Sequence, residues 1–159
     1  MKKTFSSVNY IDFEFILDDA TGAAVSEFEF QETVFNSSGS DWASYNVQLG
    51  FGTGAGFTPS TAGDGLDFDA PDYNSLFSFG PFSSVTIGED SLTAFGGSFL
   101  DGTSASVVFP IDVPDGIGVF TVRQMVSTSA PVPEPSTWAL AVLGLVGLGV
   151  VARRRKRSA

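Results

Sequence analysis

Four aspartates stand close together in a glycine-rich stretch near the middle of the chain: Asp64, Asp67, Asp69 and Asp72. Alternating carboxylates in a loop offer the oxygen ligands that Ca²⁺ takes in proteins. Their spacing does not fit the EF-hand loop, so a Ca²⁺ site here would be of another kind. The competing interpretation is an acidic turn, in which the Asp side chains cap backbone N–H groups. Apart from Ca²⁺, the sequence predicts no cofactor.

A single cation and a few aromatic residues are the other candidates for binding. Arg123 is the only Lys or Arg between Lys3 and Arg153, whereas the segment between Thr4 and Val122 contains 17 Asp and Glu residues. We expect it to pair with one or more of them, on the strand face opposite Phe120 and Val122. A ligand-anchoring role for it stays open. Trp42, Tyr45 and Tyr73 could stack on a sugar, although aromatic residues on strands are more often core residues.

The chain offers little for catalysis. It contains no His and no Cys, which removes the commonest general base and all thiol chemistry. No nucleophile elbow, phosphate-binding loop, dinucleotide fingerprint or zinc signature is present. A pair of carboxylates for glycoside hydrolysis is not excluded, but neither spacing nor context points to one. The sequence therefore predicts a protein that is not an enzyme.

The C-terminal segment carries three features in succession: a proline-rich motif (131–137), an apolar run (138–152) and a basic end (153–159). As a helix, the apolar run spans roughly 22 Å, and interfacial Trp and snorkelling Arg stems extend it toward the ~30 Å hydrocarbon core. Because basic residues stay on the cytoplasmic side, we expect a single-pass helix with a cytoplasmic C-terminus. A buried core helix is the alternative. The residues of the expected anchor are Trp138, Leu140, Val142, Leu143, Leu145, Val146, Leu148, Val150 and Val151; those of the basic stop signal are Arg153, Arg154, Arg155, Lys156 and Arg157.

This succession closely resembles the PEP-CTERM sorting signal, with Pro133, Glu134, Pro135 and Ser136 as its sorting motif. The resemblance implies recognition by the membrane enzyme exosortase as partner, with cleavage near the motif. The prolines remove backbone donors and keep the segment extended, which suits entry into an enzyme cleft. A stiff linker is the plainer interpretation of the prolines. Segments of the body, such as 36–52 and 64–69, are similar to β-rich exported domains that often precede this signal.

The body before this signal, residues 1–130, reads as strands throughout. Alternating apolar residues predict strands at 10–17, 25–35, 42–51, 104–109 and 119–125, and shorter ones at 66–68, 85–87 and 92–95. Residues 50–65 are expected to form a long loop, and 114–116 a turn. Short strands with turns at this spacing predict an all-β fold, an antiparallel β-sandwich of jelly-roll or immunoglobulin-like type.

Charge and composition bound the function. The net charge of −10 excludes nucleic acid as a partner, since the body offers no surface that neutralises phosphate. Met1, Lys2 and Lys3 look like the charged start of an export signal, but no apolar stretch follows; we expect either an upstream start or a truncated copy. The predicted function is that of an exported bacterial protein, a membrane-bound precursor that reaches the cell surface or matrix and acts structurally or adhesively with exopolysaccharide. The alternative is a Ca²⁺- or glycan-binding module on a plain membrane anchor.

Overall fold

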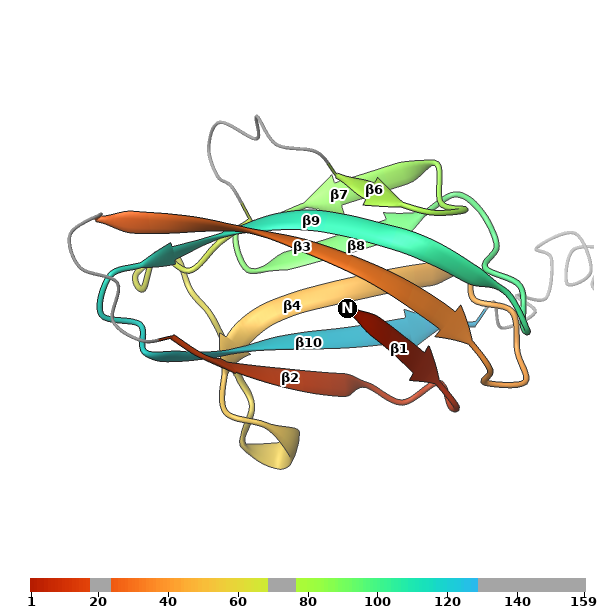
Figure 1. Ribbon diagram of the computed structural model, residues 1–159, viewed down its shortest axis with the longest axis horizontal. Helices are drawn as coiled ribbons and strands as arrows, with labels where there is room; N and C mark the ends of the chain where they lie inside the picture. The colour runs from red at the N-terminus through yellow and green to blue at the C-terminus, as the bar shows by residue number, and fades with distance from the viewer. Residues whose placement is uncertain (18–23, 69–76, 129–159) are drawn as a thin grey trace, which may run out of the picture. The chain divides into compact units, whose positions relative to one another are not determined.

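The computed structural model describes residues 1–17, 24–68 and 77–128, and these residues form two β-sheets (Figure 1). Met1–Thr128 is one compact unit. Sheet A has the strand order β1-β3-β9-β6, and sheet B the order β2-β10-β4-β8-β7, with β5 paired to β4. The strands of sheet A are β1 (Lys2–Phe5), β3 (Val25–Asn36), β9 (Ser104–Pro114) and β6 (Ser78–Phe79). Those of sheet B are β2 (Ile11–Ile16), β10 (Val119–Ser127), β4 (Ser44–Phe51), β8 (Ser91–Phe95), β7 (Ser84–Ile87) and β5 (Thr58–Pro59); a 3₁₀ turn, η1, covers Gly54–Gly56.

An aromatic core lies between the two sheets. Phe15 of β2 contacts Phe30 of β3 edge-on, with ring centroids 4.9 Å apart, and so joins sheet B to sheet A. Phe30 stacks on Phe109, which in turn stacks on Phe79. In Figure 1, β3 of sheet A crosses in front of β4 of sheet B. The predictions of an all-β fold and of inward-facing apolar residues on alternate positions are therefore confirmed, because period-two alternation requires one buried face on each strand.

The expected purely antiparallel pairing is wrong for one strand. β1 runs parallel to the end of β3, with Lys2 opposite Thr33 and Phe5 opposite Asn36. The segment that we compared with the start of an export signal is thus a strand of the folded domain. Its sequence shows only one inward-facing apolar residue, Phe5, because the other inward position is held by Lys3, and this hid the strand from pattern analysis.

Other differences concern short or proline-containing segments. Residues 66–68 form no strand, only a bridge between Asp67 and Asp112, although Leu66 and Phe68 are fully buried as core residues. β9 continues past its expected end at Phe109, through Pro110. The proline is tolerated because it lies opposite Glu29, where the main-chain groups of β9 point away from β3. It also lies beyond Val108, the last residue of β9 that pairs with β6, so neither β3 nor β6 needs its missing N–H. The expected loop 50–65 contains η1 and β5, and β6 is too short to be predicted.

The turn after β9 follows the prediction. Ile117 N donates to Pro114 O at 3.2 Å, and Gly116 adopts a φ of 92°, which disfavours other residues. No helix among the described residues is long and apolar enough to cross a membrane. The name of the sandwich topology, jelly-roll or immunoglobulin-like, stays a prediction.

The core generates a first prediction. Replacing Phe109 by Ala removes a side chain that is fully buried between Phe30, Phe79 and Phe68. We expect the free energy of unfolding in urea to fall by about 3–5 kcal/mol. The matched control Phe95→Ala removes an exposed ring of β8 and should cost less than about 1 kcal/mol. Equal losses for the two variants would contradict an aromatic core centred on Phe109.

Candidate functional site

The sorting residues predicted at the C-terminal end lie outside the described residues. This holds for the motif Pro133–Ser136, for the apolar run 138–152 and for the basic residues 153–157. The single-pass helix and its cytoplasmic end therefore stay predictions. What the structure adds about function concerns the body.

The predicted Ca²⁺ loop is described only in part, since Asp69 and Asp72 lie outside the described residues. Asp64 acts as a cap of its own turn: Oδ1 accepts hydrogen bonds from Ser60 Oγ at 2.5 Å and Leu66 N at 3.1 Å. Its Oδ2 accepts from Thr61 N at 2.9 Å. Burial opposes ionisation of this carboxyl, but the hydrogen bonds outweigh it and lower its pKa below the ordinary value. The capping interpretation thus fits Asp64.

Asp67 is placed differently from Asp64. Its main chain bridges to Asp112 of β9, with Asp112 N donating to Asp67 O at 2.9 Å. No group of three or more acidic, His or Cys side chains with metal-binding geometry occurs in residues 1–17, 24–68 and 77–128. Ca²⁺ binding by the complete set of four aspartates stays a prediction.

The aromatic sugar platform is wrong for two of its three members. Trp42 and Tyr45 are 0% and 1% exposed, so neither ring can stack on a ligand. Trp42 packs edge-on against Phe5 and Phe99, and Tyr45 lies beside both Phe5 and Phe79. The core interpretation is confirmed for these residues. Tyr73 lies outside the described part of the chain.

Arg123 pairs with a carboxylate, as expected, and the partner is Asp12 of the neighbouring strand β2. Arg123 Nε donates to Asp12 Oδ1 at 2.7 Å, and Nη2 donates to Asp12 Oδ2 at 2.8 Å, a bidentate pair. The guanidinium lies between two rings, 4.1 Å from the centroid of Tyr10 and 4.0 Å from that of Phe57. Since its side chain is only 13% exposed, Arg123 has little surface left for an anionic ligand.

The same ion pair fastens the loop between β4 and β5 onto sheet B. Arg123 Nη2 also donates to Gly54 O, and Gly54 N donates to Asp12 Oδ2 at 2.7 Å. Phe57 then covers Gly50, where a Cβ atom would lie only 2.8 Å from the ring. Opposite Gly50, Thr121 is fully buried, and its Oγ1 is the one buried side-chain oxygen without a hydrogen-bond partner in the described part of the chain. The contacts around Asp12 and Arg123 thus hold the loop on sheet B, which is a structural role.

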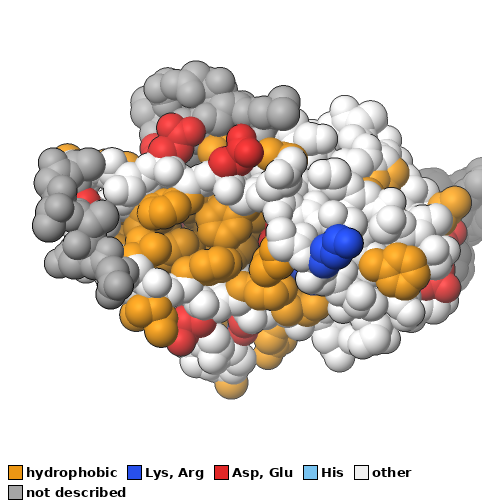
Figure 2. All heavy atoms as spheres, viewed as in Figure 1, with side chains coloured by type: hydrophobic (Ala, Val, Ile, Leu, Met, Phe, Trp, Pro, Cys, Tyr) orange, Lys and Arg blue, Asp and Glu red, His pale blue; other side chains and the backbone are white. Residues whose placement is uncertain are grey.

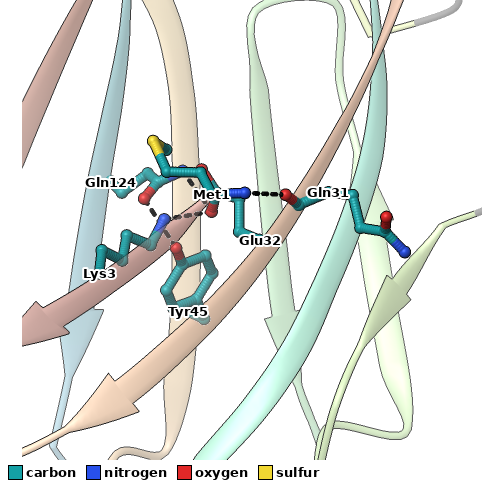
Figure 3. A network of polar contacts seen from close by, with 6 residues as sticks. All are labelled: Met1, Lys3, Gln31, Glu32, Tyr45 and Gln124. Atoms are coloured by element: carbon teal, nitrogen blue, oxygen red, sulfur yellow. Dashed lines mark hydrogen bonds and ion pairs between the residues drawn. The ribbon is translucent and has the colours of Figure 1, made fainter.

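A second polar cluster, which sequence patterns did not reveal, lies inside the sandwich (Figure 3). Glu32 of β3 is 2% exposed and forms an ion pair with Lys3 of β1. Gln124 Nε2 of β10 donates to both carboxylate oxygens of Glu32 at 3.1 Å, and Tyr45 Oη of β4 donates to Gln124 Oε1 at 2.9 Å. We call these four residues the buried network. It links two strands of sheet A to two of sheet B.

Burial sets the protonation of the buried network. Desolvation lowers the pKa of Lys3 from 10.5 to about 8, against the opposing attraction of Glu32. Burial, and then the charge of Glu32, raise the pKa of Tyr45 well above 10.0, so its hydroxyl stays a donor. Lys3 also lies 5.3 Å from the ring centroid of Phe13 and 5.5 Å from that of Tyr45. Every polar group of the cluster has a partner within it, which leaves no group directed at a substrate.

Two of the surface pockets are lined by described residues. One of about 350 Å³ lies between residues 80–81, 98–100 and 103–105, and no ionisable side chain lines it. The other, of about 310 Å³, lies where β1 begins, beside Met1, Lys2 and Gln31. The first offers no general acid or base, and in the second Glu32 is committed to Lys3. Neither pocket presents a catalytic constellation.

Comparison with protein families locates one feature of known role. The PEP-CTERM protein-sorting motif matches residues 131–156, which confirms the resemblance inferred from the sequence. The motif supports a membrane-associated precursor that exosortase sorts to the cell surface. No curated protein and no solved structure matches the chain.

The buried network generates a prediction about pH. Because the folded state holds Lys3 at a pKa of about 8 and the unfolded state at 10.5, the unfolded chain binds more protons between these values. The free energy of unfolding should therefore rise from pH 8 to pH 10, through Lys3 alone by on the order of 1–3 kcal/mol. Above pH 10 the raised pKa of Tyr45 acts in the opposite direction.

Urea unfolding at several pH values measures this rise. Lys3→Met should abolish it, whereas Lys2→Met, at an exposed position of the same strand, should keep it. A rise that persists in Lys3→Met would assign the effect to another group.

The Asp12–Arg123 pair generates a third prediction. Asp12→Asn should weaken the attachment of the loop, so that the amide of Gly54 exchanges its hydrogen faster, by about tenfold or more.

The same pair predicts a dependence of stability on pH. The hydrogen bonds from Arg123 lower the pKa of Asp12 in the folded state below its unfolded value of 3.8. The carboxyl therefore stabilises the fold at pH values above 3.8, and this stabilisation is lost as the pH falls through the lower pKa of the folded state. Asp12→Asn should flatten the acid limb of the stability curve. Glu14→Gln is the control, because Glu14 lies on the same face of β2 but is exposed. A Gly54 amide unchanged in Asp12→Asn contradicts the assignment.

Proposed function

We propose that the described domain is a non-catalytic protein of the cell surface, with a structural or adhesive role in contact with extracellular polysaccharide. The observation that carries this proposal is the sorting motif at 131–156, which follows directly on a compact acidic β-domain. The motif directs the domain to the cell surface. What the domain does there has to be argued from its own residues.

The absence of His and Cys from the sequence supports a role without catalysis. Three carboxylates that are wholly or partly buried are engaged in the fold: Glu32 with Lys3, Asp12 with Arg123 and Asp64 with its own turn. A hydrolase acting on glycans needs two carboxyl groups that face one cleft with separated pKa values. These three residues lie in different parts of the domain and do not supply such a pair.

A strongly acidic surface suits a secreted structural protein. Two of the three cations in residues 1–128, Lys3 and Arg123, pair with carboxylates, which leaves the surface strongly acidic. Such a surface keeps the protein soluble and repels anionic polymers. It therefore favours neutral polysaccharides over anionic ones.

For the tail we propose the topology that its sequence indicates. Residues 138–152 form a single membrane-spanning helix in the precursor, with Arg153–Arg157 on the cytoplasmic side. Exosortase recognises Pro133–Ser136 and cleaves nearby, so that the domain ends on the cell surface or in the matrix. The alternative of a Ca²⁺- or glycan-binding module on a permanent anchor has less support, since Trp42 and Tyr45 are buried and Asp64 is engaged.

Cleavage of the tail is the fourth prediction. We would express the full chain behind an export signal, in one host that contains exosortase and in one that lacks it, and measure the intact mass of the product. We expect the mass of the tail to be lost near Pro133–Trp138 only when the enzyme is present. The triple change Pro133→Ala, Glu134→Ala and Pro135→Ala should prevent the loss, whereas Pro114→Ala, Asp115→Ala and Asp112→Ala in the body should not.

The role of the domain needs a separate readout. Cells that display the chain should bind labelled neutral polysaccharide more strongly than cells without it, and should release no reducing ends from the polysaccharide.

Each proposal has an outcome that would contradict it. In the cleavage experiment, a tail that persists in both hosts would contradict sorting by exosortase. Cells that gain no polysaccharide would contradict the adhesive role, and release of sugar would contradict the absence of catalysis.

A further inference from the structure

One edge of sheet A is covered over only part of its length. β3 pairs with β9 from Val25 to Phe35, but on its other side β1 pairs only with Thr33–Asn36. Within residues 1–17, 24–68 and 77–128, no strand pairs with this side of β3 between Val25 and Gln31. We call Val25–Gln31 the open edge, although Gln31 O, at its end, already accepts a hydrogen bond from Met1 N. In Figure 1, β1 covers the arrowhead end of β3 and the rest of that side is uncovered.

The main-chain groups at the open edge point outward. Met1 N donates to Gln31 O at 2.8 Å, and Thr33 N donates to Met1 O at 2.8 Å, so the odd-numbered residues of β3 direct their main-chain groups toward β1. The position of Pro110 opposite Glu29 agrees, since Pro has no N–H to give to Glu29. Glu29 therefore presents its N–H and C=O at the open edge, in line with β1.

Beside the open edge, the space between the two sheets is an apolar groove. Figure 2 shows a hollowed hydrophobic area between β3 and β2, the edge strand of sheet B. Phe15 and Phe30 meet across it, and other half-buried apolar side chains pack against the core on both sides. Those side chains are Ile11 and Leu17 from the β2 segment and Phe28 from β3.

The rims of the groove are acidic. The exposed Glu29 of β3 and the exposed Glu14 of β2 alternate with the inward-facing aromatic residues. Figure 2 shows acidic side chains on both sides of the hydrophobic area. Pairing of this edge with the same edge of a second copy would bring like charges together, which disfavours self-association.

We propose that the open edge and its groove accept an extended segment of another polypeptide, which adds to β3 as a strand. Alternate apolar side chains of the segment enter the groove, and Lys or Arg side chains between them meet the acidic rims. Main-chain hydrogen bonds to Glu29 supply affinity, and the alternation supplies selectivity. Because Met1 N is already bonded to Gln31 O, the added strand cannot extend past Gln31. The inference does not depend on the role proposed for the tail.

A peptide of alternating Lys and Val with blocked ends, about seven residues long to match the open edge, is the probe. It is titrated into the full chain in a mild non-ionic detergent and followed by fluorescence anisotropy, with hydrogen exchange of residues 25–31 as the second readout. We expect binding together with slower exchange in this stretch. A peptide with the same residues in two blocks, and one of alternating Glu and Val, should each bind at least about tenfold more weakly.

Two variants at one position separate the main chain from the charge. Glu29→Pro removes the outward N–H without breaking a bond to β9, and should weaken binding at least about tenfold. Glu29→Gln keeps the N–H and loses the charge, and should weaken binding only about two- to threefold. If Glu29→Pro does not fold, an N-methylated Lys–Val peptide tested on the unchanged chain gives the same comparison, since it lacks the donors that strand addition needs.

Three outcomes would overturn the proposal. The first is absence of binding, or equal binding of the alternating and block peptides. The second is binding without slower exchange at residues 25–31. The third is concentration-dependent dimerisation of the chain that protects residues 25–31 without peptide, which would make a second copy the occupant.

Discussion

The carboxylate of Glu32 is the constraint on which the arrangement of the sheets depends. A carboxylate taken out of water costs several kcal/mol unless a charge and hydrogen bonds replace its hydration. Here Lys3 supplies the charge and Gln124 supplies two N–H contacts, while Tyr45 orients the amide of Gln124. Since these residues come from β1, β3, β4 and β10, the network fixes how sheet A lies against sheet B. Aromatic packing alone would tolerate small shifts between the sheets, because apolar contact has no direction.

The same network determines where β1 lies, and so which part of the molecule stays uncovered. Lys3 reaches Glu32 only if β1 pairs with the last residues of β3, opposite Val34. The edge from Val25 to Gln31 is then without a neighbour among the described strands, and the aromatic side chains behind it are half-buried. Acidic residues along an open edge are a common means of preventing strands of like molecules from pairing. The charge that protects this edge also selects a basic partner for it.

On the outer face of sheet B, the Asp12–Arg123 pair has a different task. It joins β2 to β10 and holds the loop at Gly54 through both its N–H and its C=O. Arg123, the cation that stood out in the sequence as a candidate ligand anchor, is thereby engaged in the fold. Together the two ion pairs leave the surface strongly acidic. The sorting motif at 131–156 supports delivery of this acidic domain to the cell surface.

The sequence by itself determined the features that depend on neighbouring residues along the chain. Alternation at Phe28 and Phe30, or at Tyr45, Val47 and Leu49, is local, so it predicted strands and their buried faces; the order and chemistry of the C-terminal residues likewise revealed the sorting motif. Only the tertiary structure decided which residues meet across the sheets. Arg123 finds Asp12 at a separation of 111 residues and Lys3 finds Glu32 at 29, and no local pattern encodes either pair. β1 escaped prediction for the same reason: its inward Lys3 breaks the apolar alternation, and only the distant carboxylate of Glu32 makes that burial favourable.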